Sequence, residues 1–191
     1  MKRGSRALGI AESYRGETST LAGCVVRASR VVDGFVFGSC TVGGTDATNA
    51  ILSLVEQLDR EDVSYLLVSG IAPAWFNILD LHRLHEETGL PVLSVTFETS
   101  DGLESAIREA FDDEEATARL RRYRSQPSRH AVDVGTETLY IRSVGLTADE
   151  GAAVVRAFTP EGGRPEPVRV ARLAARAADE FGHTHTTDDC G

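Results

Sequence analysis

Ser69 and Gly70 stand where an α/β protein usually places its chemistry, directly after an apolar segment. Residues 65–68 are nearly all apolar, as expected for an interior parallel strand that is buried on both faces. In open α/β sheets, ligands and reacting groups collect outside the carboxyl ends of such strands, so a catalytic residue is expected at position 69. The serine found there is unexpected. Trp75 and Phe76 follow closely, and they are either a base-contacting wedge beside the site or core aromatics.

A basic block at residues 119–129 is the feature best suited to nucleic-acid binding, because arginines beside an aromatic ring combine phosphate contact with base stacking. The block consists of Arg119, Arg121, Arg122, Tyr123, Arg124 and Arg129. Acidic residues at 112–115 precede it, so charge balance within one helical region is an alternative explanation. Arg169, Arg172 and Arg176 recur at spacings of three and four, and they either extend this basic track or are solvated.

Three strands are predicted at the start of the chain, at residues 7–11, 21–26 and 35–42. Asp33 and Gly34 form the sequence signal of a tight hairpin between β-rich segments, so the second and third strands should pair antiparallel. An antiparallel meander of three strands follows from this pattern.

Helices and strands alternate after the meander. Apolar residues that recur at helical spacing predict a helix at 46–58 with Asp46 as its N-cap, and a second helix is predicted at 75–88. Each helix is followed by a buried strand, at residues 65–68 and 92–97. This order predicts an α/β fold of the ribonuclease H-like kind, a mixed sheet in which an antiparallel three-strand meander is followed by parallel strands, with helices on both faces.

The remaining chain should add one strand and four helices to a single domain. The strand is predicted at residues 138–142, and the helices at residues 103–110, 114–124, 147–157 and 168–181. Residues 1–181 are expected to form this domain, and residues 182–191 a disordered tail.

The chain is acidic, and its basic residues are almost all arginine. Lysine and arginine together number 20 against 29 aspartates and glutamates, which gives a formal net charge of −9. Lys2 is the single lysine, and an acidic, lysine-poor surface predicts a halophilic source. In molar salt the Debye length is about 3 Å, so repulsion between the protein and DNA is screened as well. The net charge therefore does not exclude a nucleic-acid substrate.

The sequence predicts neither a membrane span nor a disulfide framework. No apolar run approaches the roughly 18–20 residues that a membrane helix needs, which predicts a cytoplasmic location without a membrane partner. Cys24, Cys40 and Cys190 are odd in number, and the first two lie inside predicted strands, so buried thiols are the simpler interpretation.

Two further motifs carry a family resemblance. Glu-Glu-Thr-Gly-Leu-Pro-Val at residues 86–92 and Pro-Glu-Pro-Val-Arg-Val-Ala at residues 165–171 resemble motifs of the archaeal endonuclease V-like family, which is also called endonuclease dU. The resemblance spans most of residues 8–178. It implies one endonuclease V-like domain that cuts DNA containing deaminated bases and uses Mg²⁺ or Mn²⁺.

The resemblance also implies acids at three places near the strand ends. Residues 9–12 read Gly-Ile-Ala-Glu where "G-I-D-D" is expected, and residues 42–48 read Val-Gly-Gly-Thr-Asp-Ala-Thr where "V-D-G-x-D-A-T" is expected. At the end of the strand predicted at residues 65–68, an Asp-Gly pair is expected and residues 69–70 read Ser-Gly. The three substituted positions are therefore Ala11, Gly43 and Ser69.

Glu12 and Asp46 remain as candidate catalytic residues and metal ligands. Asp46 alternatively serves only as a helix N-cap, and Glu12 should point to the face opposite residue 11 if the strand extends that far. Two Mg²⁺ ions about 4 Å apart require a cluster of carboxylates. The substitutions therefore predict a metal site that has lost its ligands.

Two functions stay open. One is an endonuclease with weak or altered use of metal. The other is a catalytically inactive relative that binds damaged nucleic acid or a partner protein through residues 119–129 and the former cleft. A phosphate-transferring enzyme of the actin-like branch of this fold is disfavoured, because only Gly43 and Gly44 suggest a phosphate loop.

Overall fold

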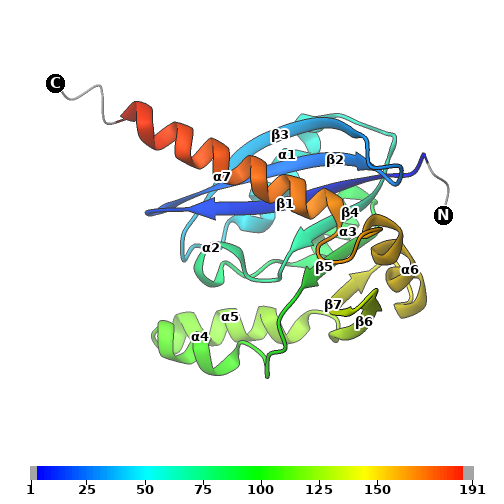
Figure 1. Cartoon of the computed structure of the whole chain (residues 1–191). Helices are drawn as coiled ribbons and strands as arrows, with labels where there is room; N and C mark the ends of the chain where they lie inside the picture. The colour runs from blue at the N-terminus through cyan, green and yellow to red at the C-terminus, as the bar shows by residue number, and fades with distance from the viewer. Residues whose placement is uncertain (1–3, 187–191) are drawn as a thin grey trace.

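The computed structural model describes residues 4–186, which form a seven-stranded mixed sheet with helices on both faces (Figure 1). The strands are β1 (Arg6–Tyr14), β2 (Thr18–Arg27), β3 (Val32–Thr41), β4 (Val63–Ser69), β5 (Val92–Thr96), β6 (His130–Val134) and β7 (Glu137–Val144). The helices are α1 (Ala47–Leu58), α2 (Pro73–Phe76), α3 (Leu81–Thr88), α4 (Glu104–Ala110), α5 (Asp113–Ser125), α6 (Ala148–Phe158) and α7 (Glu166–Thr186).

The strand order is β3-β2-β1-β4-β5-β7-β6. β2 pairs antiparallel with both β1 and β3. β4 pairs parallel with β1, and β5 pairs parallel with β4. The predicted meander followed by parallel strands is confirmed. β7 pairs antiparallel with β5 and with β6, and β6 was not predicted. Only Val132 and Val134 are buried in β6, so its period-two signal is too short to identify a strand.

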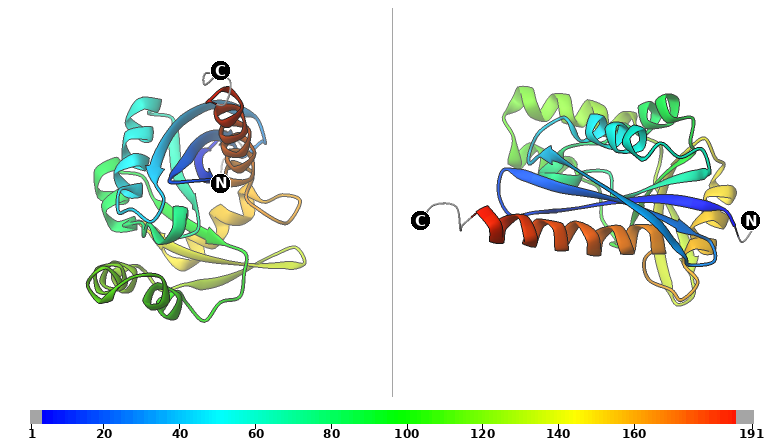
Figure 2. Two further views of the ribbon diagram at one scale, coloured as in Figure 1. Left: turned by 90° about the vertical axis from the view of Figure 1, so that its left-hand side faces the viewer. Right: turned by 90° about the horizontal axis from the view of Figure 1, so that it is seen from above.

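Two cores lie on the two sides of the sheet. On one side, α1 contributes Ile51 to a cluster that contains Leu66 of β4. On the other side, Leu67 of β4 packs in a cluster with residues of α6 and α7. Figure 2 shows α7 crossing one face of the sheet while α1 covers the opposite face. A Cβ atom at Gly9 would lie 2.1 Å from the carbonyl carbon of Pro167, so glycine allows α7 to approach β1 this closely.

The helix predicted at residues 75–88 is wrong in its first half. Ala74, Trp75 and Phe76 have φ angles of +48°, +58° and +57°, and α3 begins only at Leu81. Asp80 caps α3 by accepting a hydrogen bond from the Arg83 amide at 3.1 Å. The irregular backbone before this cap prevents one continuous helix.

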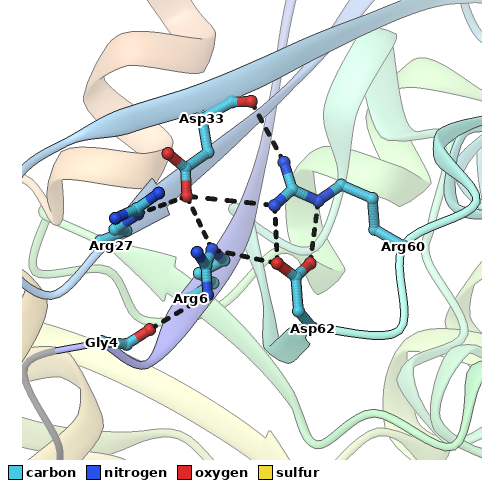
Figure 3. Close-up of polar contacts among 6 residues, drawn as sticks. All are labelled: Gly4, Arg6, Arg27, Asp33, Arg60 and Asp62. Atoms are coloured by element: carbon cyan, nitrogen blue, oxygen red, sulfur yellow. Dashed lines mark hydrogen bonds and ion pairs between the residues drawn. The ribbon is translucent and has the colours of Figure 1, made fainter.

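The predicted turn at Asp33 and Gly34 is also wrong, because both residues lie inside β3. The chain reverses at residues 28–31, where Arg30 has a φ of +70°. Asp33 accepts hydrogen bonds from Arg6 and Arg27 at 2.6 Å each, and Figure 3 shows this cluster. An aspartate that binds two arginines is fixed in the strand rather than free to form a turn.

The C-terminal helix continues beyond the point where a tail was predicted. α7 extends to Thr186, and residues 187–191, including Cys190, lie outside the described part of the chain. Within residues 4–186, no helix combines the length and apolarity needed to cross a bilayer. Cys24 and Cys40 are buried free thiols, and burial raises the pKa of each to about 12.

Candidate functional site

The ends of β1 and β4 meet at a narrow cavity, where the sequence predicted the site. Its volume is about 10 Å³, which is close to the room that one water molecule needs. Ala11, Glu12 and Ser69 line this cavity, while Gly43 and Asp46 lie in the connection between β3 and α1. The structure therefore brings three of the five predicted positions together.

Glu12 and Ala11 follow the alternation of β1, which extends to Tyr14. Ala11 packs with Ala171 of α7 in a small apolar cluster. Glu12 is half-buried, and its carboxylate accepts a hydrogen bond from the Ser19 hydroxyl at 2.8 Å. Although both residues border the cavity, successive side chains of a strand point to opposite faces, so the Glu12 carboxylate does not replace an acid at position 11.

Asp46 occupies the N-cap position of α1 but does not cap the helix with its side chain. Its carboxylate accepts hydrogen bonds from the Thr41 amide at 3.1 Å and from the Asn77 side chain at 2.7 Å. The Asn77 amide oxygen instead accepts a hydrogen bond from the Ala47 amide at the start of α1. Partial burial raises the pKa of Asp46, but the hydrogen bonds from Asn77 and Thr41 outweigh it and leave this pKa below its ordinary value.

Asn77 is therefore an organising residue that sequence reasoning missed. It is fully buried and connects the end of β3, the start of α1 and the segment after α2. No sequence pattern around it signals this role.

Gly43 is held through its backbone from two sides. Its amide donates to the Ala74 carbonyl at 2.7 Å, and its carbonyl accepts a hydrogen bond from the Arg119 guanidinium. A φ of +70° suits glycine at this position. Arg119 is buried, lies 3.7 Å over the Phe111 ring and pairs with Glu115 at 3.3 Å. The structure thus places this predicted nucleic-acid-binding residue in the interior.

Trp75 projects into solvent beside Gly43. Its side chain is 52% exposed, whereas Phe76 is half-buried and makes an edge contact with Phe111. Both aromatic residues have a left-handed backbone, which is rare for bulky side chains. Strained backbone is common at functional sites, so the exposed indole is a candidate contact for a base.

The other members of the basic block separate into groups. Arg121 and Arg124 line a shallow groove on α5 together with Arg108, and Arg124 is ion-paired with Glu104. Arg122 is half-buried and has no side-chain hydrogen bond or ion pair in the described structure. The remaining two members, Tyr123 and Arg129, line a separate pocket.

This pocket has a volume of about 300 Å³ and opens at the ends of β4 and β5. Such a volume is at the small end of the range for ligand sites. Ser69 lies at its edge, so the pocket adjoins the narrow cavity. Four arginines from different parts of the chain line it, namely Arg129, Arg142, Arg164 and Arg172. Apart from the basic-block member Arg129, these arginines are too far apart in sequence to form a visible motif.

A family profile described as Endonuclease dU matches residues 3–179 of the chain. A UPF0215 protein from Thermococcus kodakarensis is 37% identical over 163 residues, which cover 84% of this chain and 82% of the relative.

Several solved structures are similar over nearly the whole chain, and two of them illustrate the range of identity. A protein of unknown function from Archaeoglobus fulgidus has a TM-score of 0.80 and 30% identity, covering 91% of this chain and 98% of the other. Ciona intestinalis endonuclease V, solved with DNA that contains an inosine, has a TM-score of 0.61 and 12% identity, covering 93% of this chain and 86% of the other. At this low identity, the second likeness concerns the fold, and it agrees with the predicted ribonuclease H-like class.

Proposed function

Because this chain belongs to the endonuclease dU family, we propose that it is an endonuclease V-like protein that binds DNA containing deaminated bases without a two-metal centre. The proposal separates recognition from cleavage. Recognition is attributed to the arginine-lined pocket and to the exposed aromatic side chain of Trp75 beside Gly43. Strand cleavage is not attributed to the residues at the strand ends.

The chemistry of the donor set carries this proposal. A methyl group, a hydrogen atom and a hydroxyl group stand at Ala11, Gly43 and Ser69, where the family resemblance implies carboxylates. Hard cations such as Mg²⁺ require several oxygen ligands, and carboxylates supply them best. In the described part of the chain, no three His, Cys, Asp or Glu side chains are grouped so that they could hold a metal ion. The residues present therefore do not fit the two-metal centre.

The two remaining carboxylates support the same conclusion. Both oxygens of Asp46 already accept hydrogen bonds, from Thr41 and from Asn77. Glu12 accepts one from the buried Ser19 hydroxyl. A metal ion at Asp46 would compete with these donors for both oxygens, and Glu12 lies on a different segment.

Nucleic-acid binding is supported by features that survive around the strand ends. The arginines of the pocket can contact phosphates, and the exposed Trp75 ring can stack on an extrahelical base. The likeness to an endonuclease V solved with inosine-containing DNA supports a deaminated base as the recognised lesion. The exposed Arg121 and the half-buried Arg122 of the basic block would contact the backbone further along the strand.

Base recognition can be tested by fluorescence anisotropy with duplexes that contain one deoxyuridine or deoxyinosine and with a matched undamaged duplex. We expect tighter binding to a damaged duplex, and a loss of this preference in Trp75→Ala, because stacking is worth about 1–3 kcal/mol per base. Leu173→Ala removes another exposed apolar side chain, on α7, and should leave the preference intact. Equal affinity of the wild-type protein for all three duplexes would contradict the proposal.

The proposed loss of metal ligands at the strand ends can be tested by calorimetric titration with Mn²⁺. The wild-type protein should show no saturable binding, and the triple variant Ala11→Asp, Gly43→Asp and Ser69→Asp should gain it. Asp is better tolerated than most residues at the positive φ of Gly43. Saturable binding to the wild-type protein that the triple variant does not improve would indicate a rearranged site. The halophilic source and the cytoplasmic location stay predictions. Because the cytosol of a halophile would contain molar salt, both experiments should be run at low and at molar salt.

A further inference from the structure

We infer that the pocket at the ends of β4 and β5 binds a phosphomonoester group, such as the phosphorylated end of a nucleic-acid strand, through Arg142, Arg164 and Arg172. The inference rests on the proposed function in so far as the phosphate belongs to a nucleic acid. It adds which part of the ligand enters the pocket and which charge state is preferred.

The first reason is the charge of the pocket. Four arginines line it, and Glu98 is the single carboxylate in its lining. Elsewhere nine arginines form ion pairs, whereas none of these four does so within residues 4–186. An otherwise acidic chain of net charge −9 thus places four arginines against one carboxylate in one hollow.

The second reason is the contacts that hold two of these guanidinium groups. Arg129 donates to the backbone carbonyl of Glu98 at 2.7 Å and lies 4.0 Å over the Tyr140 ring. Arg142 donates to the Tyr123 hydroxyl at 3.0 Å and to a backbone carbonyl. These neutral partners fix the orientation of the guanidinium groups without cancelling their charge, which preorganises them for an anion.

The third reason is the proximity of Arg164 and Arg172. Arg164 lies 4.4 Å over the Phe97 ring, and neither arginine has a hydrogen bond or an ion pair in the described structure. Burial and the charge of Arg172 lower the pKa of Arg164, while Glu98 opposes this effect. Two like charges held near each other are stabilised when an anion enters between them.

The group that fits this arrangement best is a phosphate with two negative charges. A phosphomonoester carries about −1.5 to −2 charges at neutral pH and offers three terminal oxygens, because its second pKa is about 6. An internal phosphodiester carries one charge and two free oxygens. Arginine forks match phosphate oxygens in paired hydrogen bonds, and Ser69 and Ser94 in the lining can donate further ones.

The experiment compares oligonucleotides of one undamaged sequence that end in a phosphate or in a hydroxyl, with the phosphate placed at either end in turn. Thymidine monophosphate and thymidine provide the same comparison for a free nucleotide. We expect at least about a tenfold preference for the phosphorylated ligand in one of these pairs, as expected for charge-assisted hydrogen bonds. The preference should decrease as pH falls below about 6, where the phosphate gains a proton.

Arg172→Gln and Arg164→Gln should each remove most of this preference. Arg176→Gln is the matched control, because Arg176 is exposed on the same helix and does not line the pocket. Arg172 is also exposed, so its substitution should not impair folding, which circular dichroism would verify.

Equal affinity for phosphorylated and unphosphorylated ligands, or a preference that both pocket variants retain, would overturn the inference while leaving DNA binding possible. A preference confined to thymidine monophosphate would support the pocket and contradict the assignment of the phosphate to the end of a nucleic-acid strand, whereas the duplex comparison with Trp75→Ala tests the proposed function. The two claims can therefore fail separately.

Discussion

Arginine side chains gather beyond both ends of β4, and the two groups differ in what they contact. Before the amino end, Arg6, Arg27 and Arg60 surround the carboxylates of Asp33 and Asp62 (Figure 3). Beyond the carboxyl end, three of the four pocket arginines contact aromatic rings, a hydroxyl group or backbone carbonyls, namely Arg129, Arg142 and Arg164. The same residue type thus serves two purposes within one sheet.

The cluster at the amino end is complete without a ligand. Its members come from β1, β2, β3 and the segment before β4. The cluster therefore joins all three strands of the meander to the parallel part of the sheet. Hydrogen bonds from Arg27 and Arg6 lower the pKa of Asp33 to about 2. The comparison indicates that paired arginines stabilise the fold, whereas arginines without carboxylate partners are available to an external anion.

The largest expected effect comes from giving the pocket a carboxylate of its own. Ser69→Asp should lower the affinity for phosphorylated DNA by at least about tenfold, because an internal anion would take the hydrogen bonds meant for the ligand. Ser64→Asp is the control, since Ser64 is exposed on the same strand and lies outside the pocket. Unchanged affinity in Ser69→Asp would show that the pocket arginines do not bind the phosphate.

A moderate effect on stability is expected from Asp33→Asn. Arg27 would lose its ion pair, and Arg6 and Arg60 would keep only the Asp62 carboxylate. The melting temperature should therefore fall by roughly 2–4 °C while DNA affinity stays unchanged. Asp101→Asn, at an exposed position without a side-chain hydrogen bond or ion pair in the described structure, is the control. A loss of DNA affinity in Asp33→Asn would contradict the division between the two arginine groups.

The contribution of Asp33 should also depend on pH. Since its pKa is lower in the folded state than the ordinary value of 3.8, the stabilisation is fully present above that value and is lost as pH falls through about 2. Urea denaturation of the wild-type protein and Asp33→Asn should therefore converge in strong acid. If the difference in unfolding free energy between the two proteins stayed constant throughout this pH range, the ionised Asp33 carboxylate would not be its cause.

The smallest effect is expected for an exposed pair. Arg124 donates to Glu104 at 3.0 Å on the surface of α4 and α5, where solvent screens the interaction. Arg124→Gln should change the melting temperature by less than about 1 °C. A decrease as large as that of Asp33→Asn would mean that surface ion pairs contribute more than their exposure suggests.

Much of the fold was predictable because the apolar periodicity of its elements is strong. The buried residues of β4 and the apolar stripe of α1 identify their elements without tertiary information. α2 was not predictable, because its backbone depends on Asn77, a buried residue that bonds to segments about thirty positions away. Local patterns cannot reveal such a contact.

Of the candidate site, the sequence reveals the substituted positions more readily than the other residues. Ala11, Gly43 and Ser69 stand out because the motifs around them are intact. The basic block was visible as a linear cluster, but helix periodicity turns Arg119 inward and Arg121 outward. The pocket joins residues as distant as Ser69 and Arg172, so only the folded chain shows it.

The most direct test follows binding and cleavage in one sample. Duplex DNA with a single deoxyuridine is bound to the protein in EDTA and in Mn²⁺, its anisotropy is measured, and the same mixtures are separated by denaturing electrophoresis. We predict equal binding in both conditions and an intact strand. Nicking beside the deoxyuridine that requires Mn²⁺ would contradict the proposal that this protein recognises its substrate without a two-metal centre.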